Sequence, residues 1–296
     1  MTKSGSRQRR RASPLKCTNG GLSVSKTDGQ LGVWKTVGSV VTGAIHLRKE
    51  QPCQDALYLS PPNSRFAIAC VADGHGSESC PYSDDGATAA VSVAGELLEK
   101  MLPNLSDHKD IWLPKQIEAN WKDAVREIHE KKGRDKPEPP EAFPYTFYGT
   151  TLLALAATDS FVFALQIGDG NILMIDADGS ARAVLAEADS SSNVGEDTES
   201  LCLAEAWRHV RTQIIPWNPA DGAPMFMLST DGYANGFINN AGFLKAGSDI
   251  YKLLQEEGLA YIENELPAWL RQSSDKGSGD DIALVLFAFE REDLNG

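Results

Sequence analysis

The sequence predicts an α+β domain built from antiparallel sheets. Three segments with strand character follow one another without a helix between them, at 147–157, 161–167 and 171–175. Three others repeat apolar residues at helical spacing, at 90–101, 117–128 and 262–270. Because strands joined without an intervening helix pair antiparallel, we expect a layered α+β fold and not a doubly wound one.

The remaining elements follow from local signals in chain order. A fully apolar run at 66–72 ends at Asp73 and reads as a buried strand, and a similar run at 225–229 ends before Asp231. The segment 282–289 predicts a last strand after a glycine-rich loop. Pro267 lies inside the third helical segment and predicts a kink or a division there. Two proline-rich or serine- and acid-rich stretches are expected to be irregular, at 132–144 and 188–200.

Length and composition limit the classes of protein that are possible. The chain has 296 residues, of which 42% are hydrophobic, as in globular proteins with a substantial core. No apolar run reaches the roughly 18 to 20 residues of a membrane span, and no apolar stretch follows the basic N-terminus as a secretory signal would require. We expect a disordered basic arm over 1–30 and a single domain over 31–290, in a cytoplasmic monomer.

The charge distribution argues against nucleic acid and membrane as partners. The net charge is −13, and six basic residues but no acidic ones lie within the first 16 positions. The rest of the chain therefore carries 22 basic against 41 acidic side chains. Such a body repels phosphate backbones and anionic lipid surfaces.

The cysteines do not predict a disulfide framework or a zinc site. There are five of them, with no CxxC pair and no cluster with histidine. We interpret them as reduced, structural thiols.

Aspartates recur where predicted strands end. Asp73, Asp169 and Asp231 are each followed by glycine, and Asp280-Asp281 comes directly before the last strand. An Asp-Gly pair most often marks only a turn. Several carboxylates converging on one site would instead repel one another unless a cation neutralised them, and oxygen ligands without cysteine or clustered histidine favour Mg²⁺ or Mn²⁺.

Six short motifs occur in the order seen in one family of enzymes. They are Gln54-Asp55, Val71-Ala72-Asp73-Gly74-His75-Gly76, Gly149-Thr150-Thr151, Ile167-Gly168-Asp169, Leu228-Ser229-Thr230-Asp231-Gly232 and Gly279-Asp280-Asp281-Ile282. With these motifs the chain resembles the metal-dependent protein phosphatases of the protein phosphatase 2C-like (PPM) family, bacterial type, over about residues 34–289. The resemblance implies a four-layer α/β/β/α sandwich of two antiparallel sheets flanked by helices.

The resemblance also implies a metal site with two Mn²⁺ or Mg²⁺ ions and room for a third. By position, Asp73 would bridge two ions and the Gly74 carbonyl would bind one of them. Asp231 and Asp280 would bind the other ion, although Asp281 could share or replace the role of Asp280. Asp55 would lie near the first ion, directly or through water, and Asp169 matches the residue that helps to hold a third ion.

Two further roles carry over to this chain. His75, next to the bridging Asp73, resembles the proton donor to the leaving serine or threonine oxygen, although a surface or metal-shell histidine is the alternative. Bacterial relatives carry an arginine five residues before the first aspartate to hold the phosphate, whereas this chain has Glu50. His46, Arg48 and Lys49 are nearby, and we choose Arg48 because a guanidinium matches a phosphate in a bidentate way.

These observations predict metal-dependent hydrolysis of phosphoserine and phosphothreonine in proteins. The partners would be a phosphorylated protein and the serine/threonine kinase that acts with it. Two alternatives stay open, a non-catalytic phosphoprotein sensor and a phosphatase of small metabolites. The segment 186–206 corresponds by position to the flap beside the active site in bacterial relatives.

Overall fold

The structure is a computed structural model that describes residues 32–63, 65–135, 143–185 and 199–291. The predicted basic arm and positions 186–198 of the expected flap lie outside these ranges. Within them, no helix combines the length and the apolar character that a membrane crossing demands.

The described strands form two five-stranded sheets in which every pairing is antiparallel. The first sheet has the order β1-β10-β9-β6-β7 and the second the order β2-β3-β4-β5-β8. The strands are β1 (Val33–Val41), β2 (Asp55–Leu59), β3 (Phe66–Asp73), β4 (Leu152–Thr158), β5 (Phe161–Ile167), β6 (Asn171–Ile175), β7 (Ala181–Ala183), β8 (Arg211–Pro216), β9 (Met225–Ser229) and β10 (Ile282–Glu290).

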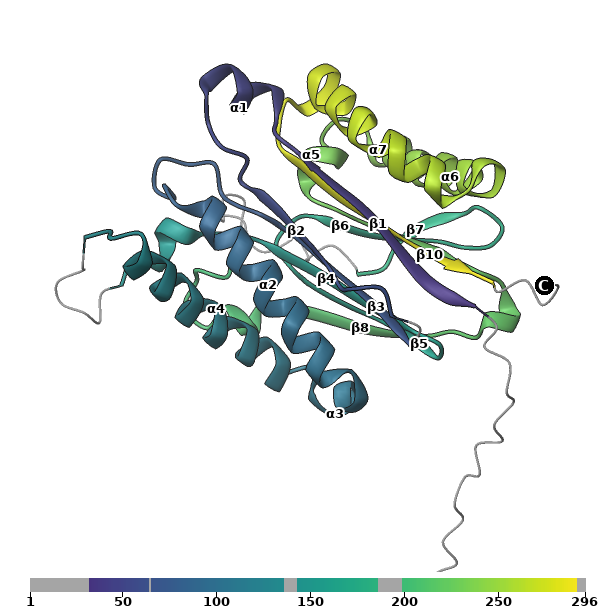
Figure 1. Ribbon diagram of the computed structural model, residues 1–296, viewed down its shortest axis with the longest axis horizontal. Coiled ribbons are helices and arrows are strands. Elements are labelled where there is room, and N and C mark those ends of the chain that lie inside the picture. The colour runs from purple at the N-terminus through teal and green to yellow at the C-terminus, as the bar shows by residue number, and fades with distance from the viewer. Residues whose placement is uncertain (1–31, 64, 136–142, 186–198, 292–296) are drawn as a thin grey trace, which may run out of the picture. The chain divides into compact units, whose positions relative to one another are not determined.

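Helices cover the outer faces of both sheets (Figure 1). Helices α2 and α4 lie on the β2–β3–β4 side, whereas α6 and α7 lie on the side of β1 and β6. The predicted four-layer α/β/β/α sandwich is thereby confirmed. The α-helices are α1 (Ala44–Lys49), α2 (Ser83–Met101), α3 (Leu105–His108), α4 (Trp112–Lys131), α5 (Asp231–Ala234), α6 (Asn240–Glu257) and α7 (Leu259–Ser273). Short 3₁₀ turns occur at η1 (Leu102–Asn104), η3 (Tyr145–Tyr148), η4 (Ala206–Arg208) and η5 (Pro219–Asp221), and a π-helical turn, η6 (Ser274–Ser278), precedes β10.

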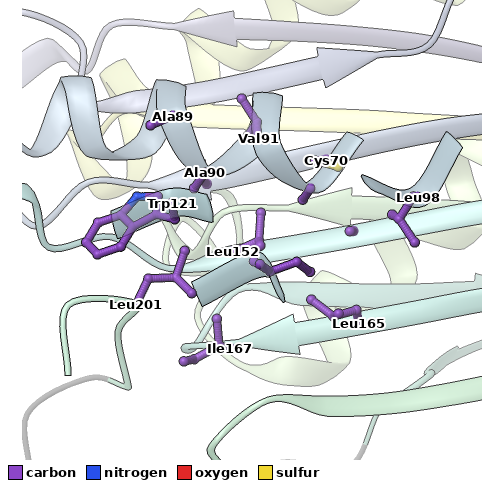
Figure 2. Packing of buried hydrophobic residues seen from close by; sticks show 14 of the residues in the cluster. Cys70, Ala89, Ala90, Val91, Leu98, Trp121, Leu152, Leu165, Ile167 and Leu201 are labelled. Carbon is purple, nitrogen blue, oxygen red and sulfur yellow. The ribbon is translucent and has the colours of Figure 1, made fainter. Parts of the chain in front are cut away.

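The strands are apolar on both faces because each sheet is buried on both sides. Along β3, Ala67, Ala69 and Val71 face the layer between the sheets. The alternate residues Ile68, Cys70 and Ala72 pack under α2 and α4, in the cluster that Figure 2 shows around Trp121 and Leu152. Strand β10 alternates in the same way between the inter-sheet layer and the layer under α6 and α7. This double burial explains why both strands read as continuous apolar runs.

The structure differs from the sequence predictions at two places. The strand expected at 147–157 begins only at Leu152, because the aromatic residues before it form the turn η3 and pack against α2, where a Cβ on Gly86 would lie 2.0 Å from the Tyr148 carbonyl oxygen. Helix α7 also runs through Pro267 without the division that was one of the two outcomes predicted there. Glu263, whose carbonyl loses its helical partner to the proline, lies on the exposed side of that helix, where water can take the bond.

Aspartates from both sheets lie at the same end of the sandwich. Asp55 begins β2, Asp73 ends β3, and the two residues are paired directly across the strands. Strand β9 ends just before Asp231, and β10 begins just after Asp281. The Thr230 hydroxyl donates a 2.6 Å hydrogen bond to Asp55 Oδ2 and so joins the two sheets at this end.

Candidate metal centre

Asp73 is held in place by its backbone. Its N–H donates to Thr151 Oγ1 over 3.0 Å, and its carbonyl accepts from the Thr151 N–H and the Thr150 hydroxyl. Its cross-strand neighbour Asp55 is buried, and their side chains lie on the same face of the sheet because opposed residues of paired strands point the same way. Two carboxylates are therefore fixed side by side on rigid strands.

Asp231 and Asp280 come from the other sheet. Asp231 is the first residue of α5, and its Oδ2 accepts from the Asn235 side chain over 2.9 Å. A Cβ on Gly232 would lie 2.0 Å from the carbonyl oxygen of Asp281, so only glycine allows these two turns to approach so closely. The Asp-Gly pair thus does more than form a turn, because it lets the carboxylates of two loops converge.

The convergence is unfavourable for the carboxylates themselves. Burial raises the pKa of Asp55 and of Asp73 well above the usual aspartate value of 3.8, and repulsion from the neighbouring aspartates raises the pKa of both further. Burial, together with Asp231 and Asp281, also raises the pKa of Asp280. Such mutual repulsion is relieved when a divalent cation lies between the groups.

The adjacent residues Asp280 and Asp281 differ in their surroundings. Asp281 Oδ1 accepts from the Gly43 N–H over 2.6 Å, and its Oδ2 accepts from the Gln54 N–H over 2.6 Å and pairs with His46 Nδ1 at 2.9 Å. Asp280 Oδ1 instead accepts one bond, from the Asp281 N–H. Both oxygens of Asp281 are thus engaged within the protein, which leaves Asp280 as the better candidate for an ion.

A pocket of about 500 Å³ opens over this centre. Its described lining includes Gly74 and five aspartates, namely Asp73, Asp169, Asp231, Asp280 and Asp281. Asp55 is not part of that lining and is only 9% exposed. Arg48 is exposed on α1 and does not line the pocket either, whereas His46 of the same helix does.

The predicted proton donor His75 also lines the pocket. Its backbone N–H donates to the Gly149 carbonyl over 3.0 Å, and a Cβ on Gly149 would lie 2.6 Å from the imidazole Cδ2. The lack of a side chain at Gly149 therefore leaves room for the His75 ring. The motif Gly149-Thr150-Thr151 positions both Asp73 and His75. Gly74, between them, donates its N–H to the Gln54 carbonyl over 3.1 Å.

The donor set fits hard divalent cations. The centre presents carboxylates, and the buried Gln54 Oε1 in the same pocket has no hydrogen-bond partner. Across the described ranges, no three or more histidine, cysteine, aspartate or glutamate side chains lie close enough together to bind one ion directly. Mg²⁺ commonly binds through one or two carboxylates and keeps several waters, so carboxylates spread around a wet pocket suit it.

Two cysteines line the pocket, which no signal in the sequence indicated. Cys80 and Cys202 contribute to its lining, and neither forms a disulfide. Burial raises the pKa of the Cys202 thiol, and burial with Asp281 and Asp55 raises the pKa of Cys53, which lies outside the pocket lining, to about 12. Thiols with a raised pKa are poor nucleophiles.

Comparisons with known proteins agree with this fold. The family model described as protein phosphatase 2C matches residues 42–271. The serine/threonine phosphatase of S. agalactiae is 17% identical and has a TM-score of 0.59, over 87% of this chain and 100% of that one. PppA, a regulatory component of the type VI secretion system in Pseudomonas aeruginosa, is 16% identical with a TM-score of 0.55, over 88% and 99%.

A third solved structure is the catalytic domain of the serine/threonine protein phosphatase PstP in complex with two manganese ions. It is 17% identical with a TM-score of 0.51, over 87% of this chain and 98% of that one. No curated protein matches the sequence. Because the family model spans most of the chain, from just before α1 to within α7, the protein belongs to the protein phosphatase 2C family.

Proposed function

We propose that this protein hydrolyses phosphoserine and phosphothreonine in proteins with the help of two Mn²⁺ or Mg²⁺ ions. The observation that carries the proposal is the convergence of Asp73, Asp231 and Asp280 on one pocket, with Asp55 paired to Asp73 across the strands. Their mutual repulsion is what a divalent cation would relieve. The two manganese ions of the PstP structure support the same choice of metal.

Each aspartate would have a distinct part in holding the ions. Asp73 would bridge both, with the Gly74 carbonyl on one of them, while Asp231 and Asp280 would hold the other. Asp55, already bonded to Thr230, would support the first ion directly or through water. Asp169, exposed at the pocket rim, would help to hold a third. When bound, such ions acidify a water, orient it toward phosphorus and neutralise phosphoryl oxygens.

His75 would protonate the departing serine or threonine oxygen. An alkoxide is a poor leaving group, so a proton donor at hydrogen-bond distance lowers the barrier to its departure. The space that Gly149 leaves for the ring places His75 beside the pocket. The exposed small residues Gly76, Ser77 and Ser79 at the rim would leave room for the backbone of a protein substrate.

We also propose that the enzyme acts as a cytoplasmic monomer that reverses the work of a serine/threonine kinase. The acidic body of the chain disfavours nucleic acid and membrane as partners.

The deciding experiment is hydrolysis of a phosphothreonine peptide by the purified chain with Mn²⁺, with Mg²⁺ and after chelation. We expect turnover with either ion and its loss on chelation, restored by added Mn²⁺. Hydrolysis confined to phosphorylated metabolites would indicate the small-molecule alternative. Binding of the phosphopeptide without turnover would indicate the sensor, and full activity after exhaustive chelation would contradict the metal mechanism.

A further inference from the structure

Two free thiols face the pocket, and the proposed hydrolysis uses neither of them. Cys80 and Cys202 both line the pocket over the aspartates, although they lie far apart in the sequence. Cys80 is 7% exposed, and Cys202 is partly exposed. A small molecule that enters the pocket therefore meets both cysteines.

The two cysteines are held at adjacent residues of one motif. A Cβ on Gly149 would lie 3.3 Å from Cys80 Sγ. At the next residue, the Ser200 hydroxyl accepts from the Thr150 N–H and donates to the Thr150 carbonyl, both over 3.0 Å. The same hydroxyl oxygen lies 3.5 Å from the Cys202 N–H, which donates to it. The Gly149-Thr150 dipeptide thus brings the two cysteines together.

The Cys202 thiol responds to the Cys80 thiol. Burial raises the pKa of Cys202, and the neighbouring Cys80 raises that pKa further. A thiol with a raised pKa stays protonated, so the reduced pair is stable at neutral pH and takes no part as a nucleophile in hydrolysis. Neighbouring thiols have a second reaction open to them, since an oxidant joins them as a disulfide.

The remaining cysteines lack this combination of access and proximity. Cys70 is fully buried in the cluster beneath α2 and α4. Cys53 lies outside the pocket lining, and Cys17 lies outside the described residues. Among the described cysteines, Cys80 and Cys202 therefore form the pair that shares one pocket.

We propose that Cys80 and Cys202 are a reversible oxidation site, at which a peroxide that enters the pocket converts the two thiols into a disulfide. The peroxide first oxidises one thiol to a sulfenic acid and leaves as water. The other sulfur then attacks the sulfenic sulfur, and a second water departs as the S–S bond forms. Each sulfur loses one electron, the O–O bond accepts both and breaks, and the two thiol protons leave in the water. An external thiol reverses the step by thiol–disulfide exchange.

The disulfide would change the surroundings of His75. A Cβ on Gly149 would lie 2.6 Å from His75 Cδ2 as well as near Cys80 Sγ, so the ring and the sulfur share the space that Gly149 leaves open. Bonded sulfur atoms lie about 2.0 Å apart, so Cys80 must shift toward Cys202 when the bond forms. We expect this shift to displace His75 and to slow hydrolysis; this effect rests on the proposed function, whereas the disulfide itself does not.

The experiment oxidises the purified full chain with hydrogen peroxide after chelation, removes the peroxide and then adds Mn²⁺. The intact mass should fall by the mass of two hydrogen atoms, and non-reducing peptide mapping should link the Cys80 peptide to the Cys202 peptide. Hydrolysis of a phosphoserine peptide should fall roughly ten- to a hundredfold, as for a small misplacement of a catalytic group. An aryl phosphate should lose less, because its leaving group needs little protonation. Dithiothreitol should restore both activities.

Three variants assign the effect to the pair. Cys80→Ser and Cys202→Ser should keep the melting temperature and the activity of the untreated wild type, and neither should show reversible inhibition by peroxide. Cys53→Ser is the matched control, because it removes a partly exposed thiol outside the pocket lining, and it should respond to peroxide as the wild type does.

The mass and the activity are read separately. Peptide maps in which Cys80 and Cys202 stay unlinked after oxidation would overturn the inference, as would reversible inhibition that persists in both single variants. A linked pair with unchanged hydrolysis would overturn the effect on His75. If the wild type hydrolyses no phosphopeptide before oxidation, the proposed function fails, and the peptide map still decides whether the two cysteines are an oxidation site.

Discussion

The two ends of the sheet sandwich are built on opposite principles. At one end Trp34, Trp217 and Phe289 pack edge to face, with ring centroids 4.8 to 5.5 Å apart. Both indole N–H groups donate to the Thr158 carbonyl, at 2.7 and 2.8 Å. At the other end the same two sheets bring together aspartates whose pKa values are raised by burial and mutual repulsion.

The difference shows how the fold separates stability from chemistry. The aromatic end buries large rings and satisfies their polar atoms, so it stabilises the folded chain. The carboxylate end holds like charges close together, which destabilises the metal-free protein and prepares a site for cations. Changes at the first end should affect folding, and changes at the second should affect activity.

The largest effect is expected at the aromatic end. Trp34→Ala should lower the free energy of unfolding by about 3–5 kcal/mol, because it leaves a cavity and removes the bond to Thr158. Denaturant melts measure this, with Trp112→Ala as control, since Trp112 is 40% exposed on α4. The remaining folded fraction should keep normal activity per molecule, and a selective loss of turnover would contradict the separation of the two ends.

At the carboxylate end, Asp73→Asn should reduce kcat by about 10²–10³, the size of effect seen when one charge-stabilising group is removed from an active site. Without metal, the same substitution should raise the melting temperature, because it removes one of the repelling charges. The control is Asp159→Asn, in the exposed turn after β4. A destabilised Asp73→Asn protein that stays active would make Asp73 structural only.

The pH dependence of stability should reveal the same repulsion. A carboxyl whose pKa is raised in the folded chain binds more protons there than in the unfolded chain. Its contribution to the free energy of unfolding is therefore fully present below the ordinary pKa of 3.8, and it is lost as the pH rises through the folded pKa. The chelated protein should therefore lose stability from about pH 4 upward as Asp55, Asp73 and Asp280 ionise. Saturating Mn²⁺ should flatten this loss, because it binds the ionised form. Melting curves across pH that are identical with and without Mn²⁺ would contradict a cation at these groups.

The smallest effect on folding is expected for Asp169→Ala. Asp169 is exposed at the rim of the pocket, where an interaction of a side chain is worth at most about 1 kcal/mol, so its removal should change the free energy of unfolding by no more than that. Turnover should fall or require more Mn²⁺, since a third ion held by few protein oxygens binds weakly. Normal turnover at low Mn²⁺ in a stable variant would remove Asp169 from the site.

The structure brings some of the predicted site residues to the pocket and leaves another outside its lining. The motifs indicated Asp73, Asp231 and Asp280, and the fold brings these residues to one pocket. The phosphate contact was assigned to Arg48 on chemical grounds, yet the short helix α1 turns that side chain outward and His46 inward. A six-residue helix shows too few turns for its buried face to be read from apolar spacing.

By itself, the sequence determined the strands that are buried on both faces, because such segments are apolar throughout. The strands β5 (Phe161–Ile167), β6 (Asn171–Ile175) and β9 (Met225–Ser229) have the bounds that their apolar runs predict. Helix α6 was missed, although Asn239 caps it by accepting a hydrogen bond from the Gly242 N–H. Few apolar residues recur at helical spacing along this helix, and a cap alone does not predict a helix.

Only the tertiary structure decided the roles of neighbours that look alike in sequence. Asp280 and Asp281 are adjacent and chemically identical, but Gly43, Gln54 and His46 occupy both oxygens of the second. Those partners lie more than 200 positions away in the chain, and antiparallel pairing of β1 with β10 brings them alongside. Local sequence specifies strands and turns because they depend on near neighbours, whereas the partners of a buried carboxylate depend on which distant strands pair.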